Sequence, residues 1–253
     1  MDIDCIRNTS ARDFGGSKAN LACLNSEVTA AVRRFHRSLP GYQPTPLQRL
    51  ERLSRRLGVR AVWVKDESYR LGLNAFKALG GAYAFGKYAA ERLDMDISEL
   101  PFDRLVSDAV RKRLGDVTLV TATDGNHGRG IAWVARRLGQ QAMVFMPKGS
   151  SPVRVRSISD EGAKVTVTDS NYDGAVRQAR DFVDAHGGVL MQDTAWPGYE
   201  KIPTWITQGY ATIMHETIEQ LGALGEGCPS HVLVQAGVGS LAGSIVGCLA
   251  ASY

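Results

Sequence analysis

From residue 60 onward, β-branched apolar runs alternate with stretches of helical period, and Gly, Pro, Asp or Asn marks each change. Runs such as VTLVTA and AKVTVT are mostly apolar, as strands of a parallel sheet covered on both faces are. This alternation predicts an α/β fold built on open parallel sheets. The expected strands are Arg60–Lys65, Val117–Ala122, Gln141–Met146, Ala163–Val167, Val189–Gln192 and His231–Ala236. The expected helices are Phe76–Leu93, His127–Leu138, Val153–Glu161, Asp173–His186, Pro203–Leu221 and Ser240–Ala250.

The alternation also suggests two lobes. A chain of 253 residues that is 44% hydrophobic can divide its core between two modest units. The strand and helix units between 117 and 192 form one compact run, and the segment 94–116 precedes them as an insertion with a loop and one short helix. We therefore expect a small lobe over 89–194 and a large lobe made of 1–88 and 195–253.

Charge and cysteine patterns exclude several classes of protein. The 30 Lys and Arg residues exceed the 26 Asp and Glu by four and are scattered, which suits small anionic ligands better than nucleic acid. No stretch reaches the roughly 18 apolar residues of a membrane span, and the start lacks an apolar signal core, so a cytoplasmic location is expected. The four cysteines show neither C-x-x-C pairing nor metal-ligand spacing, so neither a disulfide nor a metal site is expected; they are Cys5, Cys23, Cys228 and Cys248.

The segment KDESYRLGLNAFKALGG (65–81) places Lys77 after a strand and a polar loop, at the first turn of a helix rich in Ala and Gly. A lysine taken alone is usually a solvated surface side chain. A chemical role requires an amine that can lose its proton, which the positive potential of a helix start and partial burial both favour. Lys77 is therefore a candidate nucleophile.

The run TATDGNHGRG (121–130) lies where a strand passes into a helix, at the carboxyl edge of an open sheet where ligands bind. Its glycines let the backbone approach a flat ligand closely, and the Asn126 amide can donate to an oxygen. An ordinary tight turn with Asp124 or Asn126 as helix cap fits the same residues about equally well. His127 is expected to be structural.

The run HVLVQAGVGSLAG (231–243) predicts a strand, a glycine turn and a helix. Free amides at the start of a helix form a phosphate cradle, to which Ser240 can add its hydroxyl. Gly237, Gly239 and Ala242 also satisfy the G-x-G-x-x-G/A dinucleotide pattern, but no acidic strand follows about 20 residues later. A phosphate cradle is the better interpretation.

Together, a lysine after a strand, a glycine–Asn loop and a later glycine loop resemble the fold type II pyridoxal-phosphate enzymes, the tryptophan synthase β family. Nearly the whole chain, in order, is similar to the 2,3-diaminopropionate ammonia-lyases of that family. The stretches that carry this resemblance are ESYRLGLNAFKALGGAYA, TATDGNHGRGIAWVARRLG, DSNYD at 169–173, QDTAWPGYEKIPTWITQGY and QAGVGSLAGS. Ala75-Phe76-Lys77 replaces the usual Ser-x-Lys, a variation associated with the ammonia-lyase branch.

The resemblance implies a function and a set of site residues. Lys77 would hold pyridoxal 5′-phosphate as an imine, and Asn126 would face the ring hydroxyl oxygen. The phosphate would lie on Gly237, Val238, Gly239 and Ser240. Asp124 and Asp193 match the two catalytic carboxylates, and the reaction would be α,β-elimination from D- and L-2,3-diaminopropionate to pyruvate and ammonia, in a homodimer. From the residues alone, Asp193 can pair with the substrate's β-ammonium group or serve as a turn residue before Trp196-Pro197.

The chain departs from the resemblance at its carboxyl end. Because the family's chains run further, we expect the large-lobe sheet to be incomplete and the partner of the pyridine nitrogen to lie outside this chain. Two alternatives stay open: a serine or threonine dehydratase-like lyase, and an inactive truncated remnant.

Overall fold

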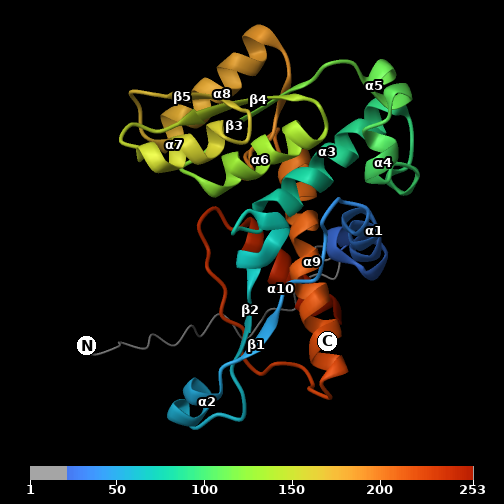
Figure 1. The fold of residues 1–253 in the computed structure, drawn as a ribbon, viewed down its shortest axis with the longest axis vertical. Coiled ribbons are helices and arrows are strands. Elements are labelled where there is room, and N and C mark those ends of the chain that lie inside the picture. Colours follow the sequence, from blue (N-terminus) through green and yellow to red (C-terminus); the bar gives the residue numbers. More distant parts are fainter. Residues whose placement is uncertain (1–21, 253) are drawn as a thin grey trace.

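A computed structural model describes residues 22–252 (Figure 1). Cys5 and the start of the chain, on which part of the targeting argument rests, lie outside the described residues. In Figure 1 the parallel sheet and its helices occupy the upper part of the molecule, and the long helix α9 (Lys201–Ala223) runs down from it. The expected α/β architecture is confirmed.

The central sheet has four parallel strands in the order β5-β4-β3-β6. They are β3 (Thr118–Ala122), β4 (Gln141–Met146), β5 (Lys164–Val167) and β6 (Val189–Leu190). Thr118 of β3 lies opposite Gln141 of β4, and Leu119 lies opposite Val189 of β6. The carboxyl ends of β3 and β6 therefore meet at one edge of the sheet, where residues 123–127 and 191–193 follow them.

Successive residues of these strands face opposite sides of the sheet, and each side has its own cover. Leu119 and Val144 pack in the main core with α6 (Asn126–Arg137), whereas Val120 and Phe145 belong to a second cluster with α8 (Tyr172–His186). Helix α7 (Pro152–Ser159) packs beside β5. This two-sided burial explains why the strand sequences are almost continuously apolar.

A group of helices below the sheet carries the segment that contains Lys77. Helix α3 (Lys77–Leu93) packs against both α6 and α9, and α9 packs against α1 (Ser26–Arg37) and α10 (Ser240–Ser252). The approach of α3 to α9 is close because glycines meet there: a Cβ added to Gly209 would lie 2.7 Å from Cα of Gly80. One hydrophobic cluster runs from α1 through α3 to the sheet. The boundaries of the two lobes therefore stay a prediction.

A narrow arm extends away from this body in Figure 1. It consists of the antiparallel pair β1 (Leu47–Arg49) and β2 (Trp63–Lys65) with α2 (Glu51–Leu57) at its tip. The strand expected at 60–65 is thus shorter than predicted and lies outside the parallel sheet. The arm leads through the 3-10 segment η3 (Glu67–Gly72) to Lys77.

Two other expectations were wrong. The insertion at 94–116 contains η4 (Ile97–Glu99), α4 (Phe102–Leu105) and α5 (Asp108–Leu114) instead of one short helix, because Asp96 and Ser107 cap separate turns. Residues 231–236 form no strand, since none of the strands in the described part of the chain pairs with them. Leu233 in this segment is 95% exposed.

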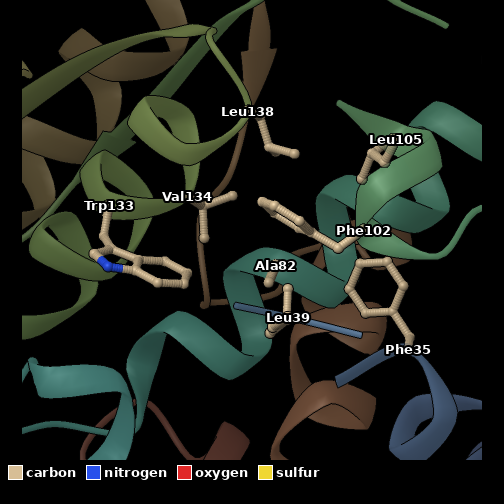
Figure 2. A pocket seen from close by; sticks show the side chains of 8 residues that line it. All are labelled: Phe35, Leu39, Ala82, Phe102, Leu105, Trp133, Val134 and Leu138. Carbon is tan, nitrogen blue, oxygen red and sulfur yellow. The ribbon is translucent and has the colours of Figure 1, made fainter. Parts of the chain in front are cut away.

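Figure 2 shows a small pocket where side chains of α1, α3, α4 and α6 converge. Every lining residue is apolar, among them Phe35, Phe102 and Trp133. A binding site needs polar groups to orient a ligand. This pocket is therefore part of the hydrophobic core.

Within residues 22–252, no helix is long and apolar enough to cross a membrane. The same residues contain no cluster of three or more His, Cys, Asp or Glu side chains able to hold a metal ion.

Candidate active site

Lys77, the first residue of α3, forms an ion pair with Asp193. Its Nζ donates a hydrogen bond of 2.6 Å to Oδ2 of Asp193, and the two side chains are 20% and 4% exposed. The amine also lies 5.5 Å from the ring centroids of both Phe76 and Tyr210, where a cation is attracted to aromatic faces. Lys77 is thus a partly buried, paired amine and not a freely solvated one.

The carboxyl edge of the sheet fixes the position of Asp193. Just before it, the Met191 amide donates to the carbonyl of Val120, and the Gln192 side-chain oxygen accepts from the Ala122 amide at 3.0 Å. Burial opposes the charged form of Asp193, but the charges of His127 and Lys77 and the hydrogen bond from Lys77 hold its pKa below the ordinary value. Asp193 is therefore a buried carboxylate that needs a cation beside it.

His127 lies near the same carboxylate oxygen. Its Nδ1 is 3.5 Å from Oδ2 of Asp193, and its Nε2 is 2.7 Å from the carbonyl oxygen of Met191. Burial lowers the pKa of His127; the Asp193 charge opposes that effect and the Lys77 charge adds to it. From the sequence, His127 was expected to be structural and to have no chemical role. The contact with Asp193 depends on the distant strand β6, and no local motif reports it.

The glycine turn before α10 contacts the backbone of Asp193. Ser240, the first residue of α10, donates its Oγ hydrogen to the carbonyl oxygen of Asp193 at 2.5 Å. A Cβ placed on Gly237 or Gly239 would meet nothing within 4 Å, and Gly239 has a φ of +94° that favours glycine. The turn therefore leaves open space at the amino-terminal end of a helix, as a phosphate cradle requires. Val238, between the two glycines, is 42% exposed.

The glycine–Asn loop approaches Lys77 from α6. Asn126 and Lys77 line one small pocket, together with Leu73, Ala75, Ala78, Arg129 and Gly130. Gly130 permits this approach, because a Cβ there would lie 2.8 Å from the Ala78 amide nitrogen. The alternative in which Asp124 or Asn126 caps the helix is wrong: Gly125 is the N-cap and no side chain caps it.

Asp124 is not part of the Lys77–Asp193 ion pair. It is exposed on the loop before α6, and its backbone carbonyl accepts a hydrogen bond of 3.2 Å from Arg154. Among residues 22–252, its carboxylate takes part in no hydrogen bond or ion pair with Lys77 or Asp193. The structure therefore brings together Lys77, Asp193, Asn126 and the 237–240 turn, with Asp124 at the margin.

These residues fit a coenzyme that carries an aldehyde, a hydroxyl oxygen on its ring and a phosphate. Lys77 supplies an amine, Asn126 an amide in the same pocket, and the turn at 237–240 open space before the 13-residue helix α10. The Lys77 amine and the 237–240 turn meet at Asp193, which touches Lys77 by its side chain and Ser240 by its backbone, while Asn126 lines a pocket with Lys77.

Comparison with known proteins gives the class. Residues 38–252 match the family model described as pyridoxal-phosphate dependent enzyme, and the chain belongs to this family. It is similar to the diaminopropionate ammonia-lyase of Salmonella typhimurium, with 52% identity over 240 residues that cover 95% of this chain and 59% of the relative. It is also similar to the crystal structure of the Escherichia coli diaminopropionate ammonia-lyase in complex with D-serine, with a TM-score of 0.87 and 48% identity over 92% of this chain and 58% of that one.

A more distant relative is the biosynthetic L-threonine dehydratase of Haemophilus influenzae, 28% identical over 218 residues that cover 86% of this chain and 36% of the relative. The chain spans about 60% of the length of the ammonia-lyases that it matches.

Proposed function

We propose that this chain carries the reactive lysine of a pyridoxal-phosphate-dependent ammonia-lyase that converts D- and L-2,3-diaminopropionate to pyruvate and ammonia. The observation that carries the proposal is the position of Asp193, which joins the Lys77 amine to the Ser240 turn. Identities of 52% and 48% to diaminopropionate ammonia-lyases support the substrate, and the E. coli relative binds an amino acid, D-serine.

In this proposal each group of residues has one task. Lys77 attaches the coenzyme, and Asn126 binds the hydroxyl oxygen on its ring. The phosphate is bound by Gly237, Val238, Gly239 and Ser240. The bound coenzyme supplies an electron sink that stabilises the negative charge left when the Cα proton is removed.

Asp193 is suited to the substrate's β-ammonium group. Its carboxylate is buried and has a lowered pKa, so it needs a cation once Lys77 has turned to the coenzyme. Asp124, exposed on the loop before α6, would serve as a base on one face of the substrate, and the freed Lys77 amine would serve on the other.

Reduction with borohydride in the presence of pyridoxal 5′-phosphate tests the assignment of Lys77. The unchanged chain should gain a stable chromophore on Lys77, and Lys77→Ala should gain none. Lys148→Ala, at an exposed lysine outside the site, is the matched control and should react as the unchanged chain does. A chromophore reduced onto a lysine in Lys77→Ala would show that the assignment is wrong.

A serine or threonine dehydratase-like lyase is the second candidate, and the 28% identical threonine dehydratase favours it. The two candidates differ in stoichiometry. Elimination from diaminopropionate releases a β-ammonia as well as the α-ammonia of the hydrolysed product, whereas serine and threonine release only the latter. Assays of keto acid and ammonia with diaminopropionate, serine and threonine, in a chain extended to the relatives' length, separate them.

A further inference from the structure

The proposed function leaves His127 without a task. This imidazole is buried, with a side chain only 5% exposed. Its Nε2 lies 2.7 Å from the carbonyl oxygen of Met191, which can only accept, so Nε2 carries a hydrogen. In the neutral ring Nδ1 is then an acceptor, and it has no hydrogen-bond partner among the described residues.

That acceptor faces another acceptor. Nδ1 lies 3.5 Å from Oδ2 of Asp193, the same oxygen that receives the Lys77 hydrogen bond at 2.6 Å. A buried acceptor without a donor is costly. The arrangement becomes favourable when a proton sits on Nδ1, but a charged His127 and a charged Lys77 around one carboxylate would leave a buried excess of positive charge. The two groups therefore compete for one proton.

The chemistry of Lys77 requires it to give up such a proton. An ammonium has no lone pair, so Nζ can attack a carbonyl carbon only after it loses a proton. Loss of that proton to bulk water would leave Asp193 as a buried carboxylate without a cation.

We propose that His127 takes up, through Asp193, the proton that Lys77 gives up when it attacks the coenzyme's carbonyl carbon. The Nζ–H bond breaks and its electron pair stays on Nζ, while Oδ2 of Asp193 receives the proton and passes it to the Nδ1 lone pair. Ammonium, carboxylate and neutral imidazole become amine, carboxylate and imidazolium, so the net charge of the three groups stays zero. His127 is a positioning residue that acts through Asp193, and the inference rests on the proposed function in giving Lys77 a carbonyl to attack.

The other titratable groups around Asp193 cannot replace His127. Tyr210 on α9, Tyr172 on α8 and Tyr199 before α9 all lie within the electrostatic reach of Asp193. Burial is the largest cause that raises the pKa of each phenol, and the Asp193 charge adds to it; the pKa of Tyr172 rises to about 12, and those of Tyr210 and Tyr199 rise well above the ordinary value. All three phenols stay neutral and accept no proton near neutral pH. Lys77 from α3 and Asp193 from the segment after β6 are the charged groups that face His127.

The first test needs no coenzyme. The titration midpoint and tautomer of His127 are followed by NMR of ¹⁵N-histidine-labelled chain, with His127→Gln to assign the signal. If the three groups share the proton, Lys77→Met raises the midpoint of His127 and Asp193→Asn lowers it, and hydrogen moves onto Nδ1 in Lys77→Met near neutral pH. A midpoint that stays the same in Lys77→Met would overturn the relay. Asp193→Asn should shift the titration midpoint of His127 in the opposite direction, so a general loosening of the fold cannot account for both results.

The second test measures how fast pyridoxal 5′-phosphate attaches to Lys77 as a function of pH. In His127→Gln, whose amide can still donate to Met191 but takes up no proton, attachment should slow by about 10²-fold near pH 7, the lower end of the range for a positioned proton acceptor. The loss should shrink at higher pH, where hydroxide removes the proton. An unchanged rate across the pH range would overturn the proposal, while absence of any attachment to Lys77 in the unchanged chain would overturn the proposed function and leave the NMR test to decide the relay.

Discussion

His36 is a second buried histidine, and it contacts α3 and α9. In α1 it is fully buried, with Nδ1 2.7 Å from the Thr212 hydroxyl and Nε2 2.9 Å from the Leu79 carbonyl. Burial lowers the pKa of His36 to about 3, although the hydrogen bond to Leu79 works in the opposite direction. The folded state therefore keeps this ring neutral at pH values where the unfolded chain protonates it.

Acid should destabilise the protein through His36. As the pH falls below the ordinary histidine value of about 6.5, the unfolded state binds a proton that the folded state refuses, and the free energy of unfolding decreases by up to about 1.4 kcal/mol per pH unit. His127 contributes with the same sign, since its pKa is also lowered. Urea unfolding between about pH 7 and pH 5, above the range of most carboxylates, should show a smaller slope in His36→Gln. Equal slopes in both proteins would contradict the expectation.

Asp124 should matter for one enantiomer. In a chain extended to the relatives' length, Asp124→Asn should reduce the release of pyruvate from D-2,3-diaminopropionate by about 10² to 10⁴-fold, the usual contribution of a general base, and far less from the L form. The amide is close to the carboxylate in shape but accepts no proton. Equal losses on both enantiomers would mean that Asp124 positions a ligand and is not a base for one face.

Individual site residues were predictable where a local pattern carried them. Lys77, Asn126 and the 237–240 turn each stand at a junction that the sequence marks with glycines; in the structure Lys77 and Ser240 contact Asp193, and Asn126 lines a pocket with Lys77. The involvement of His127 was not predictable, because its contact to Asp193 joins residues 66 positions apart through the pairing of β3 with β6. The individual roles of these residues stay predictions.

At the scale of elements, a buried ionic cluster ties the segment before Lys77 to α9. Arg70 of η3 donates two hydrogen bonds to Glu216 of α9, at 2.9 and 2.8 Å, and both side chains are fully buried. Lys65 and Tyr42 bind the same carboxylate at 2.7 and 2.6 Å. Burial opposes the charge of Glu216, but the hydrogen bonds and charge of Arg70 lower its pKa to about 2.

Removal of the Glu216 carboxylate should therefore be costly. Glu216→Leu removes one of the two carboxylate partners of the Arg70 guanidinium, which keeps Glu67, and breaking a buried pair in this way costs about 3–5 kcal/mol of unfolding free energy. Glu91→Gln, which removes one member of the exposed Glu91–Lys201 pair, is the control and should cost less than about 1 kcal/mol. Urea unfolding of the two variants checks the contrast, and similar losses would show that the cluster does not hold η3 on α9.

The contact between α3 and α9 should tolerate no added methyl group. Gly209→Ala places a Cβ 2.7 Å from Gly80 Cα and from the Leu79 carbonyl oxygen, so the helices must separate at a cost of about 1–3 kcal/mol. Gly222→Ala lies in the same helix with nothing within 4 Å, and should be neutral or stabilising by up to about 1 kcal/mol. A thermal shift of the same sign in both variants would refute the packing argument.

Elements with buried faces on both sides were the easiest to predict. Gln141–Met146 forms β4 with the expected bounds, and α3 begins one residue after the expected start. The prediction of a strand at 231–236 was wrong, because an apolar run forms a strand only where another strand pairs with it. The periodicity of the sequence does not show whether such a partner is present. Helix α1 and the arm elements β1 and α2 were not predicted, since their sequences are charged and lack the β-branched runs that marked the rest, whereas β2 lies within the strand expected at 60–65.

Across the whole molecule, apolar burial is uneven. The sheet and α3 are densely covered, whereas Leu224, Leu233 and Val246 are 56%, 95% and 60% exposed. Leu233→Ser removes almost no burial, so unfolding free energy should change by less than about 0.5 kcal/mol, and self-association should weaken. Leu79→Ala, at a fully buried position of α3, should cost about 2–5 kcal/mol. Urea unfolding and light scattering check both effects, and a large stability loss in Leu233→Ser would mean that this segment is packed in solution.

The residues of the Arg70–Glu216 ion pair are 146 positions apart in the chain, and the strands β3, β4, β5 and β6 all lie between them in the sequence. A ribosome that adds about 5–20 residues each second needs roughly 7–30 s to pass from the codon of one residue to the codon of the other. During that interval the sheet can already assemble from neighbouring units, while the guanidinium of Arg70 is hydrated because Glu216 has not yet been synthesised. The lysine segment can therefore reach its final place only after α9 has been translated, so this corner of the protein matures later than the parallel sheet during biosynthesis.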